Sequence, residues 1–505
     1  MTPRPTRVKK MWRFFAIFLI FLLIPSSFLF SRAPRDLPNT LLQYQQQKLA
    51  WVDCYGYFQC TDLSVPIDYA SLATGRFSIR VMRYKAKNQK DRIGSLVINP
   101  GGPGASGVDF AYNAEAIFSP VILSRYDIVG FDPRGVGESS AIHCLTDKET
   151  DANFAADSKP DSPTELAALV EELKNYVAKC EAFTPNILHF STTDSARDMD
   201  LLRSALGEEK LNFLGVSYGT YLGTLYAGLF PSKVGRMVLD GAVSPRATTE
   251  EQSISQAVGF DFALHAFIND CYKSTDCPLS KPLTMGISQV LAVFAQAARQ
   301  PLTGTANRPV TESMAVLGVA SSLYDRNSGW PQLKVAIAQA KVGNGSTLLS
   351  LDDQYTQRNA KGVYVTNETD ASFVIDCLDS QKNMSTSAIS RDAREFASRA
   401  PVFGPYLAYS GLACQFFTGI KATVKPITSI SSAPIVIVGT TRDPATPYAW
   451  ALDLQKTLLG SRLLTLVGDG HTGYGRGSVC VDDAVNKYFI TGLIPRADLT
   501  CRVDS

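Results

Sequence analysis

The sequence is poor in charge and in histidine. Charged residues make up 19% of its 505 residues, only four histidines occur, and the net charge is +2. Such a balance provides no basic face for nucleic acid. None of the ten cysteines forms a C-x-x-C pair, which argues against zinc or redox chemistry. The sequence therefore predicts no nucleic-acid partner, no metal and no cofactor.

Hydrophobic residues are abundant at 45%, and they allow a large core. The chain is too long for one simple domain, and no internal repeat or low-complexity segment divides it. Either one large domain with an inserted lobe or two separate domains would account for this length.

The first 33 residues carry the basic excess of the chain. A basic stretch precedes an apolar run over residues 14–30. This order is typical of a signal peptide, although Ser31-Arg32-Ala33 followed by proline is a poor cleavage site. Left uncleaved, residues 1–33 would be a signal anchor that holds the chain in a membrane. Both alternatives predict export of the body, which is then either secreted or held on the extracytoplasmic side.

An even number of cysteines supports export, because exported proteins commonly form disulfides. The sequence cannot fix their connectivity, and pairing each cysteine with its neighbour is the simplest hypothesis. Three N-x-[ST] sequons cluster in a polar region and are candidate glycosylation sites on an exposed lobe. They are Asn344, Asn367 and Asn383.

Strand and helix patterns alternate over much of the chain. Residues 34–75 indicate an irregular, disulfide-closed entry. Short apolar or alternating runs then predict strands, and helical spacing between them predicts a mostly parallel sheet flanked by helices. The predicted strands are 77–83, 95–99, 126–132, 211–215, 234–239, 433–439 and 462–467, and the predicted helices are 194–206, 218–230, 448–459 and 481–489.

The alternation is interrupted over residues 245–425, where helix-like stretches dominate (258–271, 287–298 and 314–323). Because further strands follow this region, an insert in one domain explains the pattern better than two tandem domains. We therefore expect a core formed by residues 34–244 and 426–505, with a mainly helical cap over residues 245–425.

One motif in this core predicts a nucleophile. Gly215-Val-Ser217-Tyr-Gly219 fits G-x-S-x-G, and it lies where a predicted strand ends and a helix begins. A nucleophile elbow needs this sharp turn to lift the serine above the sheet, and flanking glycines allow the close backbone approach. An ordinary glycine-rich turn is the alternative. The context favours Ser217 as a nucleophile.

A serine hydroxyl needs a base, and histidine suits that task near neutral pH. His471 follows the last predicted strand in a glycine-rich loop, whereas the other three histidines precede Ser217 or lie in the insert. Asp443 follows the preceding strand, and the chain order Ser217, Asp443, His471 favours it as the acid that orients His471. Asp240, at the end of an earlier strand, is the second candidate.

Asn99-Pro-Gly-Gly-Pro-Gly-Ala-Ser-Gly107 follows an earlier strand. A tight glycine turn there can aim a backbone N–H at an oxyanion, and we expect Gly102 to supply it. Tyr218, directly after the nucleophile, would supply the second N–H. A phosphate-binding loop is the rival interpretation, but the Lys-Ser/Thr ending of such a loop is absent.

With Phe131-Asp-Pro-Arg-Gly-Val-Gly137, Thr441-Arg-Asp-Pro-Ala-Thr-Pro447 and Gly470-His-Thr472 added, these motifs resemble the tripeptidyl/prolyl aminopeptidase branch of α/β-hydrolases. The resemblance covers residues 54–505. It implies the α/β-hydrolase fold, a Ser217, Asp443 and His471 triad, exopeptidase activity at free N-termini, no metal and a helical cap over the site.

The chain departs from this family near the end of the cap. Members commonly carry Cys-x-x-Trp-Pro, where this chain has Cys414-Gln-Phe-Phe-Thr418. The difference concerns substrate preference, so an ester or amide hydrolase acting on a small metabolite is the alternative function. Glu368 and Asp376 are candidates to hold a peptide α-amine, although solvated surface positions would also explain them. The sequence does not indicate an oligomeric state.

Overall fold

The structure, a computed structural model, describes residues 38–505 except 306–307, 381–385, 421–426, 428, 498 and 505. The predicted leader, residues 1–33 with its apolar run 14–30, lies outside the described residues, as does Asn383. Among the helices that are described, none combines the length and the apolar character needed to cross a bilayer.

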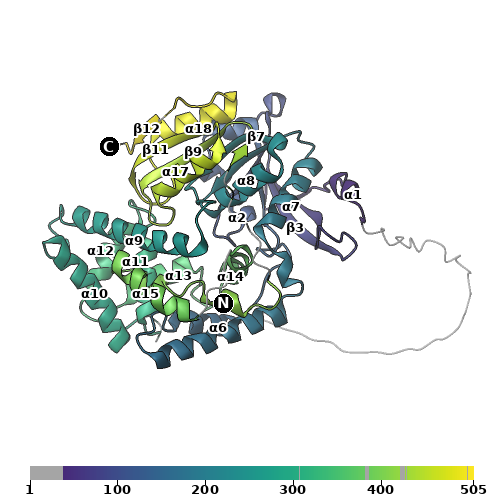
Figure 1. Cartoon of the computed structure of the whole chain (residues 1–505). Helices are drawn as coiled ribbons and strands as arrows, with labels where there is room; N and C mark the ends of the chain where they lie inside the picture. Colours follow the sequence, from purple (N-terminus) through teal and green to yellow (C-terminus); the bar gives the residue numbers. More distant parts are fainter. Residues whose placement is uncertain are drawn as a thin grey trace, which may run out of the picture. The chain divides into compact units, whose positions relative to one another are not determined.

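A ten-stranded sheet forms the centre of the core (Figure 1). The strand order is β1-β2-β3-β5-β4-β6-β7-β9-β11-β12, antiparallel from β1 to β5 and parallel from β5 to β12. A separate pair joins β10 and β8. The bounds are β1 Val52–Cys54, β2 Phe58–Pro66, β3 Arg76–Tyr84, β4 Gly94–Asn99, β5 Tyr126–Phe131, β6 Leu211–Val216, β7 Val234–Asp240, β8 Ile430–Ser431, β9 Ile435–Arg442, β10 Leu458–Leu459, β11 Arg462–Asp469 and β12 Leu499–Arg502.

Helices cover both faces of this sheet. Successive strand residues point to opposite faces, so Val97 of β4 packs in the layer with α7 and α8, whereas Leu96 and Ile98 pack in the layer with α4 and α18. Because both faces are covered, β4 and β5 are buried along their whole length, as parallel strands commonly are. The helices of the core are α1 Leu41–Gln45, α2 Gly107–Tyr112, α3 Ala114–Ile117, α4 Pro120–Arg125, α5 Asp147–Ala155, α6 Pro163–Phe183, α7 Thr192–Ala205, α8 Tyr218–Leu229, α17 Tyr448–Thr457 and α18 Val479–Thr491, with short 3-10 turns at Gln89–Asp91, Ile187–His189 and Pro231–Lys233.

Between β7 and β8 the chain is helical, as the interrupted pattern predicts. Helices α9 to α13 enclose a hydrophobic core of their own, which includes Phe267, Phe294 and Leu348. The helices are α9 Thr249–Cys271, α10 Leu283–Arg299, α11 Glu312–Ser322, α12 Gly329–Ala340, α13 Ser346–Tyr355, α14 Glu368–Asp379, α15 Thr386–Arg399 and α16 Gly404–Leu407, with a 3-10 turn at Leu412–Phe416. We call this region the cap. Helices α5 and α6 of the core also contact it.

Each cysteine forms a disulfide with its neighbour in the chain, which is the simplest pairing. The pairs are Cys54–Cys60, Cys144–Cys180, Cys271–Cys277, Cys377–Cys414 and Cys480–Cys501. Each one closes a short or medium loop, so each restricts the unfolded chain locally.

The expected mostly parallel sheet with flanking helices is confirmed, but the prediction of an irregular entry over residues 34–75 is wrong. That segment holds α1 and two strands, and β2 pairs along its whole length with β3. The burial of β2 does not alternate strictly, because Cys60 and Thr61 are both buried. The period-two signal that identifies a half-exposed strand is therefore missing.

Candidate active site

Ser217 lies between β6 and α8, at the turn that the G-x-S-x-G motif predicts. Its backbone has φ 55° and ψ −126°, which a non-glycine residue rarely adopts. Such strain is typical of a nucleophile elbow, where the backbone must reverse sharply between strand and helix. A backbone hydrogen bond to the neighbouring strand holds the turn in place, because the Ser217 N–H donates to the carbonyl of Asp240 at 2.8 Å.

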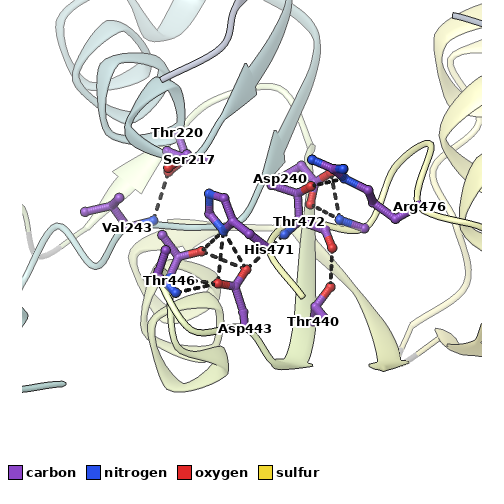
Figure 2. Close-up of polar contacts among 12 residues, drawn as sticks. Ser217, Thr220, Asp240, Val243, Thr440, Asp443, Thr446, His471, Thr472 and Arg476 are labelled. Atoms are coloured by element: carbon purple, nitrogen blue, oxygen red, sulfur yellow. Dashed lines mark hydrogen bonds and ion pairs between the residues drawn. The ribbon is translucent and has the colours of Figure 1, made fainter. Parts of the chain in front are cut away.

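His471 and Asp443 meet beside this turn. The His471 Nδ1 lies 2.9 Å from each carboxylate oxygen of Asp443, and both side chains are buried. Figure 2 shows the imidazole between Ser217 and Asp443, with its other edge toward Ser217. The Asp443 carboxylate also accepts hydrogen bonds from the N–H groups of Ala445, Thr446 and Thr472, so its position is fixed from several sides.

Asp240, the second candidate acid, has a different role in the structure. Its carboxylate accepts the N–H groups of Gly473 and Tyr474 at 2.8–3.1 Å and so holds the end of the His471 loop. Burial raises the pKa of Asp240 to about 6. Asp469, in turn, forms a two-point ion pair with Arg442. Of the three aspartates, only Asp443 contacts the imidazole of His471 through its carboxylate.

The loop that holds Gly102, one predicted oxyanion donor, approaches the turn that carries Ser217 and Tyr218. A Cβ on Gly101 would be 2.9 Å from the Ser217 Cβ and 3.1 Å from the Tyr218 nitrogen, so only glycine allows this loop to approach the elbow. The Asn99 side chain closes the loop by accepting the Gly101 N–H at 3.1 Å. Gly102 and Tyr218 then line one cavity with Ser217. Tyr218 begins α8, where a backbone N–H has no partner within the helix.

That cavity has a volume of about 390 Å³ and walls from both core and cap. Its size falls within the usual range for sites that take small molecules or short peptide ends. Cap residues Tyr324, Tyr355 and Phe373 face core residues across it. Residues of the core and of the cap thus line the same cavity as Ser217.

Two carboxylates of α14 give the cavity its charge. Asp376 and Asp379 both line it, and the described lining contains no lysine or arginine. Removal from bulk water raises the pKa of each to about 7, and Asp379 also acts on Asp376 as a like charge. Asp379 is engaged with the start of α7, because it accepts both the N–H and the hydroxyl of Thr192. Among the described residues, the Asp376 carboxylate receives one hydrogen bond, a 3.5 Å contact from Ser372.

Glu368 begins α14 and lies against the predicted oxyanion loop rather than on the outer surface. Its Oε1 would be 3.3 Å from a Cβ on Gly102, and its Oε2 accepts from Gln357 at 2.9 Å. Burial raises the pKa of Glu368 to about 7.

Sequence reasoning did not identify Asp379 or Tyr324. Asp379 lies one helical turn beyond Asp376, so the i, i+3 spacing on one face of a predicted helix would have been the signal. Tyr324 lies in a turn between two cap helices, and nothing in its sequence neighbourhood indicates that it contacts His471.

The comparisons with known proteins agree with the observed fold. The family model described as alpha/beta hydrolase fold matches residues 94–477. Serine protease Hip1 of Mycobacterium tuberculosis is 35% identical over 458 residues, covering 88% of this chain and 87% of that protein. Carboxylesterase B of the same species is 36% identical over 454 residues, covering 88% and 86%. Tripeptidyl aminopeptidase of Streptomyces lividans is 31% identical over 468 residues, covering 89% and 86%.

These matches show the class of protein: the chain belongs to the α/β hydrolase family. It is an enzyme of the serine hydrolase type, similar to relatives named as peptidases and as an esterase. The predicted fold and family are confirmed.

Proposed function

We propose that the protein is an exported serine exopeptidase that acts at free N-termini, with Ser217, Asp443 and His471 as its triad. Ser217 attacks the scissile carbonyl while His471 accepts the hydroxyl proton, and Asp443 stabilises the imidazolium that forms. The N–H groups of Gly102 and Tyr218 stabilise the oxyanion. His471 then protonates the leaving amine, and water releases the acyl group from Ser217. The contact between His471 and Asp443 supports these roles.

The main support for exopeptidase activity is the pair of acidic residues, Asp376 and Asp379, that α14 contributes to the cavity. A free peptide α-amine is an ammonium ion, and a carboxylate in an enclosed site is its natural partner. Asp379 is already held by Thr192, whereas Asp376 receives, within the described part of the chain, one distant contact from Ser372. Asp376 is therefore the residue that binds the ammonium, and Asp379 adds a second negative charge to the same cavity. A bound ammonium would favour the ionised form of Asp376, because the opposite charge lowers the pKa that burial has raised.

An ester or amide hydrolase for a small metabolite is the second candidate. It is supported by the similarity to carboxylesterase B and by the altered Cys414-Gln-Phe-Phe segment, since Cys414 lines the cavity. The same acyl-transfer chemistry would serve both functions. They differ in whether a positive charge on the substrate is required.

A matched substrate set distinguishes the two functions. A tripeptidyl anilide with a free amine should be cleaved well, and the same compound with an acetylated amine should be cleaved at least tenfold less efficiently. Asp376→Asn should raise KM for the free-amine substrate and leave turnover of a short nitrophenyl ester nearly unchanged. Exposed Glu172 of α6 provides the control, because Glu172→Gln removes a carboxylate outside the cavity. Equal cleavage of the free and acetylated peptides would favour the second candidate.

We also propose that the chain is exported. The five disulfides support an oxidising compartment. The proposed route is through either a cleaved signal peptide or an uncleaved anchor formed by residues 14–30. Asn344 is exposed and suits a glycan, whereas the Asn367 amide nitrogen donates to the carbonyls of Gly135 and Ile142 within the fold. Asn344 is therefore the better candidate of these two.

A further inference from the structure

The turn between α11 and α12 reaches from the cap to the loop that carries His471. The His471 N–H donates to the Tyr324 carbonyl over 2.8 Å, and the Tyr324 ring meets the imidazole edge-on, with centroids 5.3 Å apart. The preceding glycine allows this approach, because a Cβ on Gly470 would be 2.9 Å from the Tyr324 oxygen. A residue of the cap therefore contacts both the backbone and the ring of His471.

The next residue in the same turn contacts the other end of this loop. Asp325 lies 3.4 Å from Arg476, and the Arg476 Nε donates to the Thr472 hydroxyl at 3.1 Å. Thr472 is directly after His471, and its N–H donates to Asp443. Figure 2 shows Arg476 extending toward Thr472 beside the imidazole. A continuous path of contacts thus runs from Asp325 through Arg476 and Thr472 to the acid that orients His471.

Two backbone hydrogen bonds hold the carboxylate of Asp325 in place independently of Arg476. Its Oδ1 accepts the N–H groups of Asn327 at 2.7 Å and Ser328 at 3.0 Å, which leaves Oδ2 directed at Arg476. The pair is partly exposed, with 47% of the Arg476 side chain and 36% of the Asp325 side chain accessible. Ion pairs as exposed as this contribute little to global stability. A local role, which is to hold the His471 loop in place, fits such a pair better than a contribution to global stability does.

We propose that Asp325 and Arg476 are positioning residues that fasten the cap to the His471 loop and so keep the imidazole aligned between Ser217 and Asp443. The cap is then a fixed part of the active site as well as its cover, since lifting it away would release the Tyr324 carbonyl from His471. The inference relies on the base role proposed for His471, and it is independent of whether the substrate is a peptide or an ester.

The test uses the rate at which a fluorophosphonate labels the full chain, together with kcat and KM for a nitrophenyl ester. The labelling rate depends on the activation of Ser217 and not on recognition of an α-amine, so its outcome is separate from that of the exopeptidase test. Asp325→Asn and Arg476→Gln should each lower the labelling rate and kcat about tenfold with little change in KM, because small misplacements of a catalytic group have large kinetic effects. The double variant should be no slower than Arg476→Gln alone, because that change already breaks both the pair with Asp325 and the contact with Thr472. Arg476→Lys, which keeps the charge, should recover part of the loss.

Arg326 provides the matched control. It is adjacent to Asp325 and pairs with Asp270 of α9 at 3.1 Å within the cap. Arg326→Gln removes a similarly exposed ion pair without touching the His471 loop, so its labelling rate should equal that of the unmodified protein. The proposal is overturned if folded Asp325→Asn and Arg476→Gln proteins label at the unmodified rate, or if the two losses multiply in the double variant.

Discussion

Two buried aspartates lie beside the His471 loop, and their hydrogen-bond partners separate their roles. Asp443 contacts the imidazole nitrogen, whereas the hydrogen bonds that Asp240 accepts from described residues all come from backbone N–H groups beyond the histidine. An aspartate that orients a histidine sets its tautomer and stabilises its charged form. An aspartate that holds the backbone affects the imidazole only through the shape of the loop.

Asn substitutions should therefore have unequal effects at these two positions. Asp443→Asn should lower kcat by about 10⁴-fold, because an amide can stabilise the wrong tautomer of His471. Asp240→Asn keeps much of the loop contact and should lower kcat far less. Steady-state kinetics on one ester substrate measures both effects. If Asp240→Asn proves the more damaging change, the acid has been assigned to the wrong residue.

At the scale of helices and strands, the sequence predicted the parallel half of the sheet well. Strands β4, β6 and β7 are short apolar runs between helices, and their predicted bounds lie within a residue or two of the observed ones. The motifs at their carboxyl ends predicted a nucleophile at Ser217 and an oxyanion loop at residues 99–107, because such turns impose local rules on the chain. The strand β12 was missed, since its four residues are held in the sheet by pairing with β11 and by Cys480–Cys501.

Helix α14 shows why the rest of the site was harder to predict. Glu368 and Asp376 were considered from the sequence, but a solvated surface position explained each of them better. Their approach to Gly102 and to the cavity depends on how α14 packs against the core. Contacts of Tyr324, Asp325 and Asp379 with the core join residues far apart in the chain. Local sequence patterns do not record such long-range packing.

For the whole molecule, carboxylates with a raised pKa contribute to the pH dependence of stability. Removal from bulk water raises the pKa of buried Asp352, half-buried Glu368 and Asp379, and cavity-lining Asp376 to about 7. Between about pH 4 and pH 7 the folded chain therefore holds more protons at these groups than the unfolded chain does. The free energy of unfolding should fall as pH rises through this range, which is the sign expected when the native acid has the higher pKa.

Asp352 of α13 tests this dependence away from the cavity that contains Ser217. It is 2% exposed, and its Oδ1 has no hydrogen-bond partner among the described residues. Asp352→Asn removes the ionisation, so the loss of stability between pH 5 and pH 8 should be smaller than in the unmodified protein, by about 1–3 kcal/mol. Denaturant unfolding at the two pH values measures it, with exposed Asp62→Asn as control. An unchanged pH dependence in Asp352→Asn would contradict this explanation.

The role of Ser217 is tested most directly by mapping the site of fluorophosphonate modification by mass spectrometry. The proposed mechanism predicts a single adduct on the peptide that contains Ser217, lost in Ser217→Ala while that variant keeps the unfolding transition of the unmodified protein. An adduct on a different serine, or labelling that persists in Ser217→Ala, would contradict it.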